Sequence, residues 1–141
     1  MAKIITADNF PGQKMFLMWF GSHSTTNTVT LYPSGMASVF PYAYDFIPTT
    51  FDGEVSKVTL SNNPYSSYNT GPTGSSATLY VYKNSVLLDS DTQTYTAGTP
   101  GQQLFFTFSS ATFSAGDNIS LRFSANGLWR YVTWGIELSA T

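Results

Sequence analysis

The sequence predicts an all-β protein, a single antiparallel β-sandwich of the jelly-roll kind. Apolar and polar residues alternate in several short stretches, most clearly in residues 119–124 and 131–138, and a period of two is typical of half-buried strands. Clusters of Gly, Pro and Asn separate these stretches, and no run has the spacing of an amphipathic helix. Because many short strands between turns build sandwiches, we favour a jelly roll, with an immunoglobulin-like strand order as the alternative.

The expected strands of the first half begin with residues 14–20, KMFLMWF. This run is apolar on both faces, which is typical of a strand covered on both sides or of one whose outer face meets another subunit. Residues 1–12 precede it, and we interpret them as an N-terminal arm that ends at a Pro-Gly turn. Further strands are expected at residues 29–32, 36–40 and 54–61, the last of them after the Phe51-Asp52-Gly53 turn.

The expected strands of the second half are separated by stronger turn signals. Asn84-Ser85 predicts a two-residue turn after residues 77–83, with Leu79 and Val81 on one face. Asn126-Gly127 predicts a tight hairpin turn between the last two strands, because this pair tolerates positive φ. The strands expected here are residues 77–83, 86–88 (before a polar segment, 89–101), 104–108, 119–124 and 131–138.

Length and composition restrict the classes of function. The chain has 141 residues, no cysteine, a net charge of −2 and 10% charged residues, against about 25% in typical soluble domains. We expect one domain over residues 1–141. The lack of cysteine excludes disulfides and thiolate metal sites, and an acidic balance argues against nucleic acid as a partner. No run approaches the ~20 apolar residues of a membrane helix, so no membrane insertion is expected.

We expect neither enzymatic activity nor a cofactor. The single histidine, His23, lies in a polar loop, and no Gly-x-Ser-x-Gly motif accompanies it. One histidine without cysteines cannot supply a zinc site. A glycosidase would need a carboxylate pair, for which Asp89 and Asp91 are the candidates. We favour a solvated turn flank for this pair, and for Asp117 a turn in which the carboxylate accepts hydrogen bonds from nearby amides.

Four tyrosines lie in Pro- and Gly-rich segments where burial is not obvious. Tyrosine buries a large area while keeping a polar hydroxyl, which favours it at interfaces. Contact with a partner is the favoured interpretation, and ordinary packing and stacking on sugars remain open. The four are Tyr42, Tyr44, Tyr65 and Tyr68.

Three turn-and-strand segments resemble small β-sandwich modules of tailed-bacteriophage virion proteins. In that pattern a T-x-x-V-Y-K-N-G hairpin precedes an F-x-A-G-D-x-I-x-[LI]-R strand, and a P-F-D-G turn stands upstream. The matching segments are TLYVYKN (residues 78–84), FSAGDNISLR (113–122) and Phe51-Asp52-Gly53. Ser85 departs from the pattern, which has Gly there, and Thr49-Thr50 separates Pro48 from Phe51. The resemblance covers residues 46–138, and its Ala-Gly-Asp turn also recurs in tumour-necrosis-factor-like jelly rolls.

The resemblance implies a structural protein of the virion, assembled in the host cytoplasm. Among such roles we favour a capsid decoration (cement) protein, expected as a homotrimer, whose partners are the major capsid protein or other virion proteins. The alternative is the receptor-binding tip of a tail fibre or head fibre, where Trp129 and Arg130, together with Tyr65 and Tyr68, would meet host surface glycan. Candidate interface residues for decoration are Met15, Phe16, Trp19, Tyr42, Tyr44, Tyr65 and Tyr68.

Overall fold

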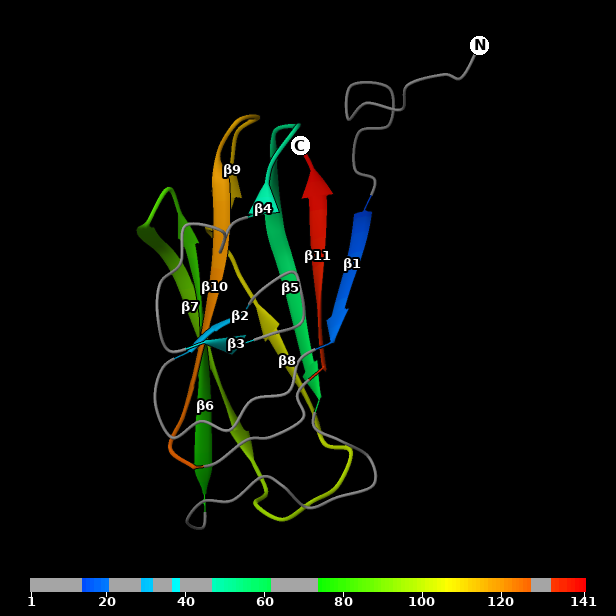
Figure 1. The fold of residues 1–141 in the computed structure, drawn as a ribbon, viewed down its shortest axis with the longest axis vertical. Coiled ribbons are helices and arrows are strands. Elements are labelled where there is room, and N and C mark those ends of the chain that lie inside the picture. Colours follow the sequence, from blue (N-terminus) through cyan, green and yellow to red (C-terminus); the bar gives the residue numbers. More distant parts are fainter. Residues whose placement is uncertain (1–13, 21–28, 32–36, 39–46, 62–73, 128–132) are drawn as a thin grey trace.

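The structure is a computed structural model that describes residues 14–20, 29–31, 37–38, 47–61, 74–127 and 133–141. Eleven strands and no helix lie in these residues (Figure 1). The strands are β1 (Lys14–Phe20), β2 (Val29–Leu31), β3 (Ala37–Ser38), β4 (Ile47–Pro48), β5 (Gly53–Ser61), β6 (Ser75–Lys83), β7 (Val86–Tyr95), β8 (Gln103–Thr107), β9 (Thr112–Phe113), β10 (Asn118–Ala125) and β11 (Thr133–Ala140).

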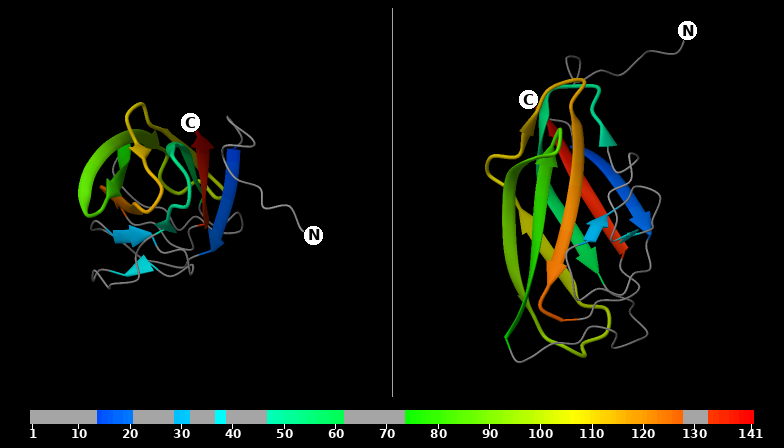
Figure 2. Two further views of the ribbon diagram at one scale, coloured as in Figure 1. Left: turned by 90° about the horizontal axis from the view of Figure 1, so that it is seen from above. Right: turned by 60° about the vertical axis from the view of Figure 1, so that its left-hand side comes forward.

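The strands form two antiparallel sheets. The first, the β5 sheet, has the order β1-β11-β5-β8, with β9 also paired to β5. The second, the β6 sheet, has the order β3-β2-β10-β6-β7, with β4 also paired to β10. The two sheets pack face to face in the views of Figure 2, which confirms the predicted all-β sandwich.

The strand order is that of a jelly roll. The β6–β7 hairpin lies at the middle of a long ribbon folded back on itself, so that β5 pairs with β8, β2 with β10 and β1 with β11. Rolling this ribbon then places β10 beside β6 and β11 beside β5. An immunoglobulin-like order is therefore excluded, because there the outer strands do not pair in this nested way.

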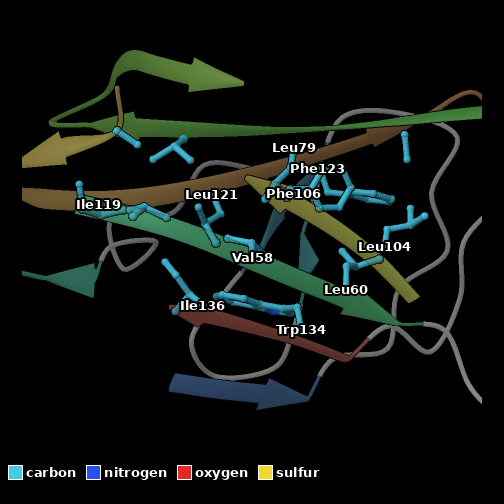
Figure 3. Packing of buried hydrophobic residues seen from close by; sticks show 14 of the residues in the cluster. Val58, Leu60, Leu79, Leu104, Phe106, Ile119, Leu121, Phe123, Trp134 and Ile136 are labelled. Carbon is cyan, nitrogen blue, oxygen red and sulfur yellow. The ribbon is translucent and has the colours of Figure 1, made fainter. Parts of the chain in front are cut away.

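The core lies between the inner faces of the sheets and is built as the alternation predicts (Figure 3). On β6 the buried residues are Ser75, Ala77, Leu79 and Val81, while Tyr80 and Tyr82 lie on the outer face. The largest fully buried side chains come from both sheets, so one core holds them together. They are Phe106, Phe123, Leu60, Leu79, Ile119, Leu121, Ile136, Val55, Val58 and Val81.

Two predictions about the connections are wrong. The last two long strands are not a hairpin, since β10 belongs to the β6 sheet and β11 to the β5 sheet. Their buried side chains enter the same core from opposite sheets. Asn126 accordingly does not adopt positive φ, because only Asn84 and Ser85 do so among the described non-glycine residues. Instead, its backbone N–H bonds to the carbonyl oxygen of Ser76, and its Oδ1 accepts from the Ser76 N–H.

The strand predicted over residues 86–88 is also too short. β7 continues to Tyr95 and pairs with β6 along its length. Polar residues are compatible with this strand because it is an edge strand, where alternate positions such as Ser90 and Thr92 face solvent. Asp89 and Asp91 therefore do not flank a turn; they lie on a strand and share its inner face.

Candidate functional site

The turn before β10 ends in Asp117, whose carboxylate organises one end of the sandwich, at the top of Figure 1. Its Oδ2 accepts a hydrogen bond from the Ser114 N–H at 2.8 Å, and its Oδ1 accepts one from Nδ2 of Asn84 at 2.7 Å. Lys83 Nζ lies 3.9 Å from Oδ2. The Ser114 amide, the Asn84 amide and, more weakly, Lys83 hold the pKa of Asp117 below its ordinary value of 3.8. The predicted role of Asp117 as a turn-stabilising acceptor is confirmed.

Asn84 connects this turn to the β6–β7 hairpin. Its backbone N–H donates to the carbonyl oxygen of Asn118 at 2.9 Å, and its Oδ1 accepts from the Asn118 N–H at 2.9 Å. Asn84 and Ser85 have φ of 50° and 70°, so both central residues of the turn are left-handed. Two successive left-handed residues are typical of the type I′ turns that join antiparallel strands. The predicted two-residue turn is therefore confirmed.

Thr49 and Asp52 complete the same end of the sandwich. Thr49 Oγ1 donates to the carbonyl oxygens of Ser114 at 2.7 Å and Asp117 at 3.0 Å. Asp52 Oδ1 accepts a hydrogen bond from the Ala115 N–H at 2.9 Å. We call Thr49, Asp52, Asn84 and residues 114–118 the turn cluster.

Gly53 comes directly after Asp52 of the turn cluster, at a position with no room for a side chain. A Cβ at this position would collide with the carbonyl oxygen of Ser139 and would lie 3.0 Å from the rings of Phe113 and Phe51. These two rings pack edge to face, with centroids 5.5 Å apart, so they cannot easily move away. The Phe51-Asp52-Gly53 motif thus combines an aromatic pair, a carboxylate acceptor and a close approach of two strands.

The carboxylate pair predicted as a glycosidase candidate lies at an edge of the sandwich. Asp89 Oδ2 accepts hydrogen bonds from the N–H groups of Ser109 at 2.9 Å and Ser110 at 3.1 Å, and from Ser110 Oγ at 3.2 Å. Its Oδ1 accepts from the Ser90 N–H at 2.8 Å. Burial alone raises the pKa of Asp89, but the amides of Ser109, Ser110 and Ser90 outweigh it and hold the pKa below 3.8.

Asp91 makes the second contact of this edge. Its Oδ2 accepts hydrogen bonds from the Thr107 N–H and from Nε2 of Gln93, both at 2.9 Å. Together, Asp89 and Asp91 connect β7 of the β6 sheet to β8 of the β5 sheet and to the turn after it, and we call the pair the carboxylate clasp. A glycosidase acid needs a raised pKa, whereas Asp89 has a lowered one. These contacts give the clasp a structural role, because it occupies backbone donors at a sheet edge.

The outer face of the β6 sheet carries a group that the sequence did not point out. The guanidinium of Arg122 lies over the ring of Tyr82, 4.3 Å from its centroid. Arg122 is opposite Tyr80 in the register, and Tyr82 is opposite Leu87. We call Tyr80, Tyr82, Leu87 and Arg122 the Tyr82 patch. No sequence motif signals it, because its members come from three strands and meet only through the register.

The predicted interface residues are placed only in part. In β1, whose backbone alone is described, Met15 is opposite Leu138, Phe16 is opposite Glu137 and Trp19 is opposite Trp134. The residues on the β11 side, Leu138, Glu137 and Trp134, are all buried. The interface role of Met15, Phe16 and Trp19 stays a prediction. The remaining candidates, Tyr42, Tyr44, Tyr65, Tyr68, Trp129 and Arg130, and the arm of residues 1–12 lie outside the described residues.

No protein-family model matches this chain, and no curated protein matches it either. Within the residues that the structure describes, no helix is long and apolar enough to cross a membrane. The same residues contain no group of three or more His, Cys, Asp or Glu side chains that could hold a metal ion. The turn cluster, the carboxylate clasp and the Tyr82 patch are thus the features from which a function is inferred.

Proposed function

We propose that this chain is a structural protein of a tailed-phage virion, a capsid decoration protein that binds the outer surface of the shell and stabilises it. The observation that carries the proposal is the turn cluster. It contains residues from all three segments of the phage-module resemblance: Asp52 of the first, Asn84 of the second and Asp117 of the third.

The turn cluster supports the proposal because it explains why the three resembling segments occur together: they contact one another at one end of the sandwich. Isolated turns of Asn, Gly and Asp arise in many unrelated β proteins. Here Asn84 and Asp117, 33 residues apart in the chain, donate to and accept from each other's segments. A resemblance in three such segments therefore concerns one three-dimensional arrangement, which is harder to reach by chance than three separate turns.

The mechanism of stabilisation is binding linkage. A protein that binds the assembled shell, but not the dissociated subunits, shifts the equilibrium toward the shell, by about 2.7 kcal/mol at a hundred times its dissociation constant. A rigid sandwich suits this role because little conformational entropy is lost on docking. A low content of charged residues, 10%, reduces the cost of desolvating the contact surface. A trimer, if formed, multiplies the contacts of each bound unit.

The test is to add the purified chain to shells that lack it. We expect saturable binding at regular sites and a higher temperature of shell disruption, with chain denatured beforehand as the control. Absence of binding at micromolar concentrations would overturn the decoration role. Adsorption to host cells in the absence of shell binding would instead support the receptor-binding tip.

A further inference from the structure

We propose that the Tyr82 patch is the surface with which the chain docks on the shell, and that it fits an apolar depression bordered by a carboxylate. This inference rests on the proposed decoration function and names the docking surface and the chemistry of its partner. The patch lies on the outer face of β10, β6 and β7, the three strands turned toward the viewer in the right panel of Figure 2.

The apolar part of the patch is produced by a β-bulge. Val81 is opposite Asp89 but Tyr82 is opposite Leu87, so Leu88 is an extra residue in β7. In a regular strand Leu88 would be opposite Tyr82 and Leu87 would point inward, whereas the bulge places Leu87 opposite Tyr82 on the outer face. Leu87 is 49% exposed on this face, while Val86, opposite Lys83, belongs to the other face of the hairpin. An exposed leucine beside an aromatic ring is typical of surfaces that another protein covers.

The charged part of the patch has no counter-charge among the described residues. Arg122 stacks on Tyr82, and its cross-strand neighbour on β6 is Tyr80, followed by Ser90 on β7. The nearby carboxylates of Asp89 and Asp91 lie on the opposite face of β7 and are occupied by the clasp. A guanidinium held in place by a ring presents its N–H groups for bidentate binding of a carboxylate.

These features favour a protein partner over a glycan. Sugars stack on an aromatic ring whose face is free, whereas a face of the Tyr82 ring is covered by Arg122. Tyrosine and arginine are enriched among the residues that dominate protein–protein binding energy. A protein surface with an apolar depression and a carboxylate at its border satisfies every group of the patch.

The experiment compares two patch variants with two matched controls on the other sheet. Leu87→Ser and Arg122→Gln remove the exposed apolar side chain and the charge of the patch. Phe105→Ser and Lys57→Gln likewise remove one exposed apolar side chain and one positive charge from the outer face of the β5 sheet, where Phe105 is 47% exposed and Lys57 lies over its ring. Binding of each purified variant to shells lacking the chain is measured by co-sedimentation, and thermal unfolding verifies that each variant is folded.

We expect each patch variant to bind shells about tenfold more weakly or worse, and each control to stay within about twofold of the wild type. Wild-type binding with equal affinities for all four variants would overturn the docking inference alone, while a wild type that does not bind shells would overturn the decoration function with it. Patch variants that lose only self-association in analytical ultracentrifugation would show that the patch is a subunit contact. Patch variants that lose only retention on host polysaccharide would show that it is a glycan site. Either result would overturn the inference.

Discussion

The outer faces of the two sheets each carry a cation over an aromatic ring, but the two pairs have different surroundings. On the β5 sheet, Lys57 lies over Phe105 at 4.6 Å, and its cross-strand neighbour is Glu137. On the β6 sheet, Arg122 lies over Tyr82 at 4.3 Å among hydroxyl-bearing neighbours. The first cation has a carboxylate on the adjacent strand, whereas no described carboxylate lies beside the second.

The two outer faces therefore differ in whether the stacked cation has an acidic neighbour among the described residues. Opposite charges on neighbouring strands stabilise a sheet, and the Glu137 carboxylate is further tied by a hydrogen bond from Ser56 Oγ at 3.2 Å. Lys57 thus has both an aromatic ring and an acidic cross-strand neighbour on this face. The outer face of the β6 sheet offers a stacked guanidinium and an exposed leucine to a partner, so the two faces are expected to respond differently to substitution.

The largest expected effect separates the inner face of the β5 sheet from its outer face. Phe105 and Phe106 are neighbours on β8, but Phe106 is fully buried in the core shared by both sheets. We expect Phe106→Ala to reduce the free energy of unfolding by about 3–5 kcal/mol, because it leaves a cavity. Phe105→Ala should change it by less than about 0.5 kcal/mol. Urea unfolding measures both, and equal losses would contradict the assigned faces of β8.

The inner faces could be predicted from the sequence, because they depend on alternation alone. The period of two in residues 119–123 identified Ile119, Leu121 and Phe123 as core residues, and all three are buried. The Asn84-Ser85 turn was equally clear, since its flanking strands are adjacent in the chain. Alternation and turn residues therefore predict the buried face of a strand and a two-residue turn, but not the length of the polar edge strand β7, which continues to Tyr95.

The pairing of strands and the outer-face groups could not be predicted in this way. β10 and β11 are consecutive and well patterned, yet they belong to different sheets, which only the rolled topology determines. The contact of Arg122 with Tyr82 depends on the register of β10 against β6. The alternation of apolar and polar residues does not determine that register. The role of Asp89 likewise depends on β8 and the turn after it, which lie about 20 residues further along the chain.

A smaller effect is expected at the clasp that joins the edges of the two sheets. Asp89→Ala leaves the amides of Ser109 and Ser110 without their acceptor, which should cost about 1–2 kcal/mol at neutral pH. Because the pKa of Asp89 is lowered in the folded protein, its contribution is present above the unfolded-state pKa and is lost as the pH falls below about 4, through the folded pKa. Thr94→Ala, on the exposed face of the same strand, serves as the control.

The measurement for the clasp is urea unfolding of wild type and both variants at pH 7 and at pH 2.5. At pH 7 the Asp89→Ala variant should unfold at lower urea than the wild type, and the gap should shrink at the acidic pH. Thr94→Ala should follow the wild type at both values, within about 0.5 kcal/mol. A gap for Asp89→Ala that does not change with pH would show that the carboxylate charge contributes nothing to the clasp.

The smallest effect concerns the hairpin that carries the Tyr82 patch, and it should improve stability. Ser85 has φ of 70°, a conformation that costs a side chain about 1–2 kcal/mol and costs glycine nothing. Allowing for the greater freedom of glycine in the unfolded chain, we expect Ser85→Gly to add about 0.5–1 kcal/mol to the free energy of unfolding. Asn84→Gly relieves the same strain but removes the bonds to Asp117 and Asn118, so it should lose about 1–2 kcal/mol.

Urea unfolding of the two glycine variants decides between backbone strain and side-chain contacts at neighbouring positions. Opposite shifts of the midpoints are expected, and a lower midpoint for Ser85→Gly would contradict the strain assigned to this turn. Because Leu87 follows two residues later and its register beside Tyr82 is set by the bulge rather than by Ser85, Ser85→Gly should leave shell binding unchanged. Stability and docking would then be separable in one hairpin, since the turn determines the first and the outward side chains of β7, β6 and β10 determine the second.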